Sequence, residues 1–239
     1  MNPRLLRPLA TGFNPEAISG LAEWWDASDA STLLLNTGAV EEWTSKSTAG
    51  TVASQSIANN RPTTTQVNGR TALLFDGSND GLDFAGVART DETWFIACEQ
   101  LSNQSTLKTF INDAASGHGI NTNLVSSARN IDTSWGNSTI GVGRIVVLNV
   151  AGNEPLPASI LSVARSAAAG IYLRRNGEQI GTATTSFSTT IQRIGYYSSS
   201  LFQLNGWIGE IICYDRALDA TELLRVERYL GGKWGVTTA

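Results

Sequence analysis

The chain has 239 residues, enough to bury a large core in a single domain without disulfides or metal ions as supports. Its formal net charge of −4 and its pI of about 5.1 argue against a nucleic-acid partner, which would require a basic surface. No window approaches the roughly 18 apolar residues of a membrane span, so we expect no membrane insertion.

Residues 1–18 have no periodic pattern, and three prolines favour extended backbone. Two interpretations remain open: a disordered terminus, or an arm that orders against a partner. The arm interpretation assigns docking to Arg4, Leu5, Leu6, Arg7, Leu9 and Phe13. We therefore divide the chain into an extended N-terminal arm, 1–18, and one domain, 19–239. No apolar stretch long enough for a signal peptide occurs here, so we expect synthesis and folding in the cytoplasm.

The first half of the domain alternates short apolar runs with polar turns, which is typical of β-strands. The segment 93–99 is apolar on both faces, and this pattern predicts a central strand covered on both sides. In the strand 21–26, Trp24 and Trp25 should point to opposite faces. Residues 44–69 are polar and predict a long loop. The strands expected in this half are 21–26, 40–43, 71–75 and 93–99.

In the second half, Asn176-Gly177 separates two strand-forming runs, 171–175 and 178–181. Asn-Gly suits a type I′ turn, because both central residues of such a turn need positive φ. The hairpin should pair with the run 159–165. The remaining strands expected in this half are 145–150, 191–196 and 207–214. This many short strands predicts a sandwich or jelly roll rather than a parallel sheet.

A single helix closes the chain. Asp219 is expected to cap its N-terminus, with Glu222 completing a capping box. Gly231 and Gly232 are expected to end it, and Trp234 to pack against the sandwich. Three apolar residues share one helical face: Leu223, Val226 and Leu230.

Four segments together resemble the concanavalin A-like jelly rolls of the laminin-G type. They are 21–29 (LAEWWDASD), 73–80 (LLFDGSND), the hairpin 173–180 and the closing segment 209–235. The resemblance implies an all-β fold, an antiparallel jelly-roll β-sandwich, to which the sequence adds one C-terminal α-helix. The short arm before Asn14-Pro15 and the Trp-Asp-Ala-Ser-Asp run look like versions of this domain in tailed-bacteriophage virion proteins.

This second likeness implies a non-enzymatic structural protein of a phage virion, either a capsid decoration protein or a tail or fibre component. Its expected partners are other virion proteins, bound through the arm, and host-surface polysaccharide; we expect a homo-oligomer on the particle. The alternative is a glycan-binding module of a bacterial cell-surface protein. A third reading is a glycoside-cleaving enzyme.

Catalytic patterns are missing from the sequence. The resemblance implies that an enzyme on this fold would carry a Glu-x-Asp-x-Glu run, which does not occur. Glu23 and Asp26 are three apart on a strand and should point to opposite faces. His118 is the sole histidine, and no Gly-x-Ser-x-Gly elbow accompanies it. We therefore expect no enzymatic activity.

Two further groups of residues are candidate sites. Oxygen-bearing side chains that suit Ca²⁺ crowd one turn, although the same residues are ordinary turn formers: Asp76, Asn79, Asp80 and Asp83. Aromatic and amide side chains that suit a glycan are Trp135, Asn137, Tyr196 and Tyr197. The aromatic rings could equally pack inside the fold. No other cofactor is expected, and Cys98 and Cys213 are expected to be buried, reduced thiols.

Overall fold

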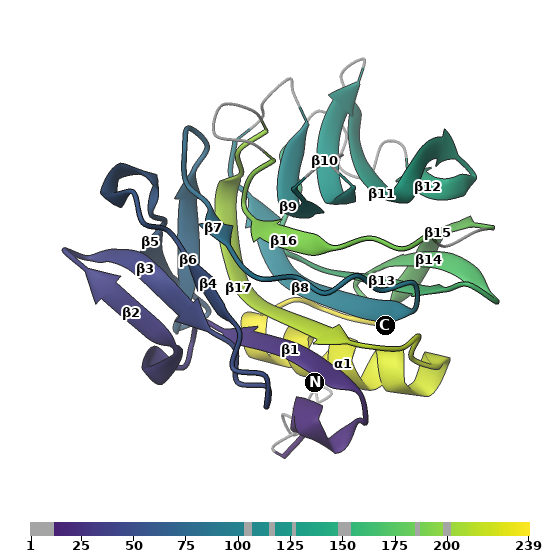
Figure 1. Ribbon diagram of the computed structural model, residues 1–239, viewed down its shortest axis with the longest axis horizontal. Helices are drawn as coiled ribbons and strands as arrows, with labels where there is room; N and C mark the ends of the chain where they lie inside the picture. Colours follow the sequence, from purple (N-terminus) through teal and green to yellow (C-terminus); the bar gives the residue numbers. More distant parts are fainter. Residues whose placement is uncertain are drawn as a thin grey trace, which may run out of the picture.

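The computed structural model describes residues 12–102, 107–114, 118–125, 128–147, 154–184, 187–197 and 202–239. Of residues 123–125, 128–129 and 136–139 it describes the backbone alone. The chain folds into an antiparallel β-sandwich with one C-terminal α-helix, which confirms the predicted fold class. Figure 1 shows the three layers: strands β9–β12 at the top, the sheet that contains β8, β13 and β17 below them, and the helix α1 at the bottom.

We call the eight-stranded sheet next to the helix sheet A. Its strand order is β15 (Glu178–Ala183), β14 (Gly170–Arg175), β13 (Ser159–Ser166), β8 (Glu92–Gln100), β17 (Asn205–Tyr214), β6 (Arg70–Asp76) and β5 (Thr63–Val67). The eighth strand, β1 (Leu21–Asp26), also pairs with β17. The helix α1 spans Ala220–Trp234.

The nine-stranded sheet on the other side of the core is sheet B. Its order is β12 (Val142–Val147), β11 (Ala128–Ile140), β10 (Gly119–Val125), β9 (Lys108–Asp113), β16 (Ile191–Ile194), β7 (Leu82–Asp83), β4 (Val52–Ser54), β3 (Ala39–Thr44) and β2 (Leu33–Asn36). Three short 3₁₀ helices lie in the first part of the chain: η1 (Pro15–Ala17), η2 (Ala30–Thr32) and η3 (Ala58–Asn60).

Sheet A is apolar on both faces. The main core fills the space between the two sheets, and a second apolar cluster lies between sheet A and α1. Trp25 belongs to the first and Trp24 to the second, which confirms that their side chains point to opposite faces. Strand β8 lies between β13 and β17, so the prediction of a central covered strand is also confirmed.

Two strands, β6 and β1, pair with different parts of the same edge of β17, and the candidate site lies where one ends and the other begins. Ile208 pairs with Leu73 of β6, whereas Glu210 pairs with Asp26 of β1. Between them, the carbonyl oxygen of Gly209 accepts a hydrogen bond from the backbone N–H of Ala27 at 3.0 Å. Sheet A is therefore interrupted at this edge, where β1 ends beside the beginning of β6.

The predicted hairpin and helix cap are both present. Asn176 and Gly177 have φ of 53° and 88°, the left-handed values that a type I′ turn requires. Asp219 accepts hydrogen bonds from the backbone N–H groups of Thr221 and Glu222, and the Glu222 side chain completes the capping box.

The predicted end of the helix is wrong. The helix continues through Gly231 and Gly232 to Trp234, and Gly235 caps it with a φ of 76°. The glycine at 231 has a packing role instead, because a Cβ there would lie 2.6 Å from both the Val236 carbonyl oxygen and a Thr238 methyl group. The C-terminal segment folds back against this point, where the Val236 N–H donates to the Gly231 carbonyl oxygen at 2.9 Å.

Two other regions differ from expectation. The segment 44–69 contains β4 and β5 rather than one long loop, and β2 precedes it. The last residues of the expected arm are packed: η1 lies within it, Ile18 is buried in the cluster under α1, and the Tyr214 hydroxyl donates to the Pro15 carbonyl oxygen at 3.0 Å. Residues 1–11, which include Arg4, Leu5, Leu6, Arg7 and Leu9, lie outside the described residues.

Candidate functional site

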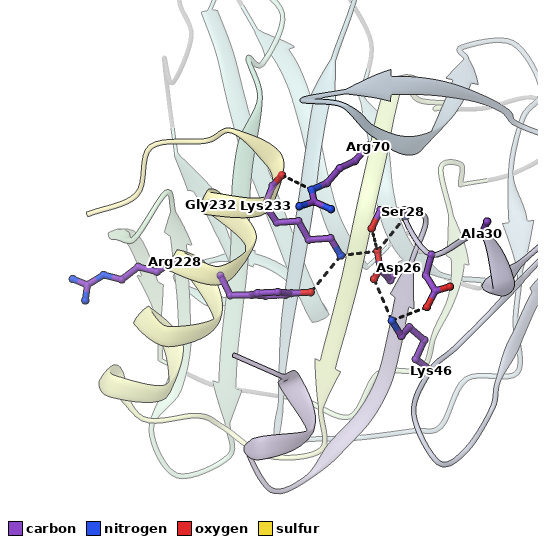
Figure 2. A pocket seen from close by; sticks show the side chains of 10 residues that line it. Asp26, Ser28, Ala30, Lys46, Arg70, Arg228, Gly232 and Lys233 are labelled. Carbon is purple, nitrogen blue, oxygen red and sulfur yellow. Dashed lines mark hydrogen bonds and ion pairs between the residues drawn. The ribbon is translucent and has the colours of Figure 1, made fainter. Parts of the chain in front are cut away.

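A pocket of about 600 Å³ opens where sheet A is interrupted (Figure 2). We call it the notch pocket. Its wall is built from the end of β1, the following segment 28–30, Lys46, the beginning of β6 at Arg70, and residues 228–233 of α1. Segments far apart in the sequence therefore meet here, because β17 holds β1 and β6 on one edge while α1 packs across the sheet.

A buried carboxylate, that of Glu210, lies beneath this pocket. It accepts hydrogen bonds from the indole N–H groups of Trp24 at 2.7 Å and Trp234 at 3.0 Å. The Tyr229 hydroxyl donates to it at 2.9 Å, and Lys233 Nζ lies 2.7 Å from its second oxygen. Burial raises the pKa of Glu210, and the nearby Asp26 charge raises it further, while Lys233 opposes both. Four donors make this carboxylate a fixed part of the structure.

Alternating charges lead from Glu210 to the surface. Lys233 Nζ lies 2.7 Å from Asp26 Oδ1, and Lys46 Nζ lies 3.4 Å from Asp26 Oδ2 and 2.9 Å from Asp29 Oδ2. Burial disfavours charge on Asp26, but Lys233 and then Lys46 hold the pKa of its carboxyl below the ordinary value. Figure 2 shows Lys233 and Lys46 approaching Asp26 from different directions, one from the helix and one from the loop after β3. The inner part of the notch pocket is thus rigid and electrostatically paired.

Polar groups at the rim are more accessible. The side chain of Asp29 is 34% exposed and that of Lys46 is 27% exposed, and Arg70 and Arg228 are exposed. Arg70 Nε donates to the Lys233 carbonyl oxygen at 3.1 Å, which fixes the base of its guanidinium beside the helix end. Carboxylate acceptors and cationic donors placed side by side can bind the hydroxyl groups of a saccharide.

A second pocket, of about 360 Å³, borders the first and shares Tyr229 and Arg228 with it. We call it the Phe13 pocket, since Phe13 lies in its wall with residues 12, 14, 17 and 225. The rings of Phe13 and Tyr229 are 5.4 Å apart, and the Arg225 guanidinium lies 5.3 Å from the Phe13 ring centre. Phe13, expected to dock on a virion partner, here contacts the domain's own helix.

The predicted glycan residues are not gathered into one exposed surface. Trp135 is fully buried in the core, and its indole N–H donates to Thr133 Oγ1 at 2.6 Å. This corrects the expectation of an exposed stacking ring, because sheet A covers the strand face that carries it. Tyr196 is also buried, and its hydroxyl donates to Asp83 at 2.6 Å. Tyr197 is half-buried, and the side chain of Asn137 lies outside the described residues.

The predicted calcium ligands do not converge on one point: Asp76, Asn79 and Asp80 take part in one turn, whereas Asp83 contacts residues of β16 and the segment after it. Asp76 Oδ1 accepts hydrogen bonds from the backbone N–H groups of residues 78 and 79, and Asp80 Oδ2 accepts one from that of Asp76. Asn79 donates to Asn60, whereas Asp83 binds Tyr196 and lies 3.5 Å from Arg193. Across the described residues, no cluster of three or more His, Cys, Asp or Glu side chains is arranged to hold a metal ion. The sole histidine, His118, has its Nδ1 3.3 Å from Oδ2 of Asp113, which is not one of the predicted calcium ligands.

The notch pocket was not predicted from the sequence. Two weak signals point toward it: Glu210 is a carboxylate within an otherwise apolar strand, and Lys233 is a cation on the buried side of the helix end. A buried charge normally has a partner, so the two could have been paired with each other.

No helix in the described portion is both long and apolar enough to cross a bilayer.

No family model and no curated protein matches this sequence. Solved structures do match the fold. Domain 4 of AbnA, a GH43 extracellular arabinanase from Geobacillus stearothermophilus in complex with arabinotriose, is 10% identical; the match covers 87% of this chain and 98% of that domain, with a TM-score of 0.58. A Trypanosoma rangeli sialidase in complex with sialic acid is 13% identical over 96% of this chain and 37% of the sialidase, at a TM-score of 0.58.

The ligand-binding domain of botulinum neurotoxin serotype D, in complex with N-acetylneuraminic acid, is 11% identical over 87% of this chain and 50% of that chain, at a TM-score of 0.56. The present chain thus spans half or less of the matched sialidase and neurotoxin chains, but nearly all of the arabinanase domain. At such identities the likeness concerns the fold alone, which is an antiparallel β-sandwich.

Proposed function

We propose that the protein is a carbohydrate-binding module and that it binds saccharide at the notch pocket. The observation that carries this proposal is the rim of the pocket, where the partly exposed Asp29–Lys46 ion pair and the exposed Arg70 surround the buried ion pairs of Lys233. Such preorganised acceptors and donors suit polyhydroxylated ligands. The matched solved domains include structures with arabinotriose, sialic acid and N-acetylneuraminic acid bound, which supports the choice of ligand class.

A glycan array with the full chain, followed by calorimetry on the best binder, tests this function. Asp29→Ala and Arg70→Ala should each weaken binding roughly tenfold, since each removes a charged hydrogen-bonding group. Glu178→Ala, an exposed carboxylate on β15, is the matched control and should leave affinity unchanged. The proposal fails if no glycan binds, or if the rim variants bind as tightly as wild type.

We further propose that the module does not cleave its ligand. Asp26 and Glu210 lie opposite each other on β1 and β17, and Lys233 already lies 2.7 Å from both carboxylates. A carboxylate held in ion pairs is poorly suited to act as nucleophile or as proton donor. Prolonged incubation with the glycans that bind, followed by chromatography for shortened products, is the test; product formation abolished by Asp26→Asn would contradict it.

A virion location for this module, with the N-terminal arm as its attachment to other virion proteins, is a second proposal. Its support is the resemblance of the short arm before Asn14-Pro15 and of the Trp-Asp-Ala-Ser-Asp run, 25–29, to versions of this domain in phage virion proteins. The structure adds that Phe13, Pro15 and Ile18 pack on the domain, so the attachment role is proposed for the residues that precede them. Deleting residues 1–11 should leave thermal unfolding nearly unchanged and block incorporation into particles, as measured by mass spectrometry of purified virions. Full incorporation of the truncated protein would refute the attachment role.

A further inference from the structure

The notch pocket and the Phe13 pocket are neighbours on one surface, because Tyr229 and Arg228 line both. Their volumes are about 600 and 360 Å³. Both residues lie in the third turn of α1, so the helix forms the common wall. The two hollows thus lie next to each other on the C-terminal half of the helix.

The two pockets differ in chemistry. The notch pocket is lined with charged groups that face one another, whereas the Phe13 pocket has the ring of Phe13 in its wall beside that of Tyr229. Apolar CH faces of a pyranose pack well against aromatic side chains, while hydroxyl groups need polar partners. One sugar unit therefore suits the notch, and a second, linked unit suits the aromatic wall.

Three arginines follow this surface, and none of them makes an ion pair with Asp or Glu within the described part of the chain: Arg70, Arg225 and Arg228. The acidic residues nearest Arg225 in sequence are already bound by other arginines: Glu227 by Arg174 at 2.8 and 3.0 Å, and Glu222 by Arg216 at 2.6 and 2.8 Å. Arg70 Nε donates to the Lys233 carbonyl oxygen and Arg228 Nε to a backbone oxygen of Ala239, at 3.1 Å in both cases. Their terminal NH₂ groups stay available, and a guanidinium fork matches a carboxylate well.

The local charge balance is positive although the chain carries a net charge of −4. Five cationic side chains line the two pockets, against three carboxylates in or beneath them. The carboxylates are Asp26, Asp29 and Glu210, and the two lysines among the cations are paired with them. The excess positive charge therefore belongs to the arginines, and it is complementary to an anionic ligand.

Building on the carbohydrate-binding function proposed above, we infer that the two pockets form one groove for an acidic oligosaccharide of at least two sugar units. One unit occupies the notch, the next packs against Phe13 and Tyr229, and an anionic substituent faces the arginines. Phe13 and Arg225 then serve the ligand rather than a virion partner.

The full chain should be assayed on an array that pairs neutral glycans with carboxylated and sulfated ones. We expect the glycans that bind to be acidic. Their measured affinities then show whether carboxylated or sulfated glycans bind more tightly. Binding restricted to neutral glycans would overturn this inference while leaving the proposed function standing, and no binding at all would remove both. Equal binding to a single-stranded oligonucleotide or to phosphatidylserine vesicles would show a general anion surface and would also overturn it.

Variants then test the groove on the best acidic binder. Arg225→Gln should weaken binding roughly tenfold and reduce its salt dependence, whereas Arg225→Lys should retain part of the affinity. Arg193→Gln, on the other sheet, is the control. Phe13→Ala should lower affinity for the oligosaccharide but not for its single acidic unit, with unchanged thermal unfolding confirming the fold. Equal losses for both ligand lengths, or none for either, would contradict a second sugar position.

Discussion

Lys233 Nζ lies 2.7 Å from Asp26 Oδ1, and this ion pair joins the end of the first strand to the last turn of the helix, 207 residues away. The lysine side chain is only 10% exposed and the aspartate side chain 6%. Since Lys233 also contacts the fully buried Glu210, it is the cation that allows two carboxylates to remain inside the protein.

Replacing Lys233 by methionine should therefore destabilise the protein strongly. The substitution keeps the length of the side chain but leaves Asp26 and Glu210 buried with their shared ammonium gone, which costs about 3–5 kcal/mol for such a pair. Urea denaturation measures the loss. Lys46→Met is the control, because Lys46 is more exposed and its pairs should contribute no more than about 1 kcal/mol. Equal effects of the two variants would disprove this role of Lys233.

Asp80 should make stability fall as pH rises. Burial raises its pKa to about 6, above the value of about 3.9 for an unfolded chain. Between those pH values the folded protein binds more protons than the unfolded one, so stability is lost as pH increases through this window. Asp80→Asn keeps an oxygen acceptor for the Asp76 N–H and removes the charge. The variant should lose this contribution and be more stable than wild type at pH 7.

Asp29 provides a control of opposite sign. Its hydrogen bond from Ser31 and its contact with Lys46 lower its pKa to about 2. The unfolded state then binds more protons between pH 4 and 2, so this contribution is lost as pH falls. Denaturation curves at successive pH values separate the two residues, and an unchanged pH profile in Asp80→Asn would contradict the assignment.

The terminal helix should be part of the domain's own core. Leu230 is fully buried under sheet A, so Leu230→Ala should cost about 2–5 kcal/mol. Breaking the cap with Asp219→Ala should cost about 0.5–2 kcal/mol. Leu224, half-buried on the other side of the helix, is the matched control and should cost less than Leu230 when truncated to Ala. A midpoint for Leu230→Ala equal to wild type would place this face in a contact with another molecule.

Cys98 and Cys213 should be unreactive thiols in the folded protein. Both are completely buried in the core between the sheets, and burial raises the pKa of both thiols, so little thiolate forms near neutral pH. Alkylation should label neither residue in native buffer and both in denaturant without reductant. A denatured mass lacking two labels would show that they are oxidised instead.

Features that depend on neighbouring residues were predictable from the sequence. The Asn176-Gly177 turn and the Asp219 cap are set by backbone geometry within four residues, and both are present. The apolar segment 93–99 also identified the central strand, since only a strand covered on both sides can bury two apolar faces.

Features that depend on residues far apart in the chain were not predictable from the sequence. The notch pocket exists because Asp26, Arg70 and Lys233 meet at an interruption of sheet A, and no local pattern shows that β1 and β6 share an edge of β17. Trp135 shows the same limit: its neighbours are polar, but sheet A covers its ring. In β5, the run Thr-Thr-Thr-Gln-Val looks like a loop because an edge strand has few apolar residues.

Replacing Gly209 by any other residue should destabilise the protein, because the indole ring of Trp234 lies directly on this glycine. A Cβ at this position would lie 2.6 Å from three atoms of the six-membered ring of Trp234, far closer than carbon atoms pack. The ring is held in place by its N–H bond to Glu210 and by stacking with Trp207 at 5.9 Å between centroids. Gly209→Ala should therefore force the indole outward and cost about 1–3 kcal/mol.

A double-mutant cycle can show that the cost arises from this contact. Trp234→Phe removes the atoms that an alanine at 209 would meet, at the cost of a cavity and of the Glu210 hydrogen bond. If the clash is the cause, adding Gly209→Ala to Trp234→Phe should destabilise clearly less than adding it to wild type, by a coupling of about 0.5–3 kcal/mol. Strictly additive effects in urea denaturation would mean that Gly209 is required for backbone reasons, independent of Trp234.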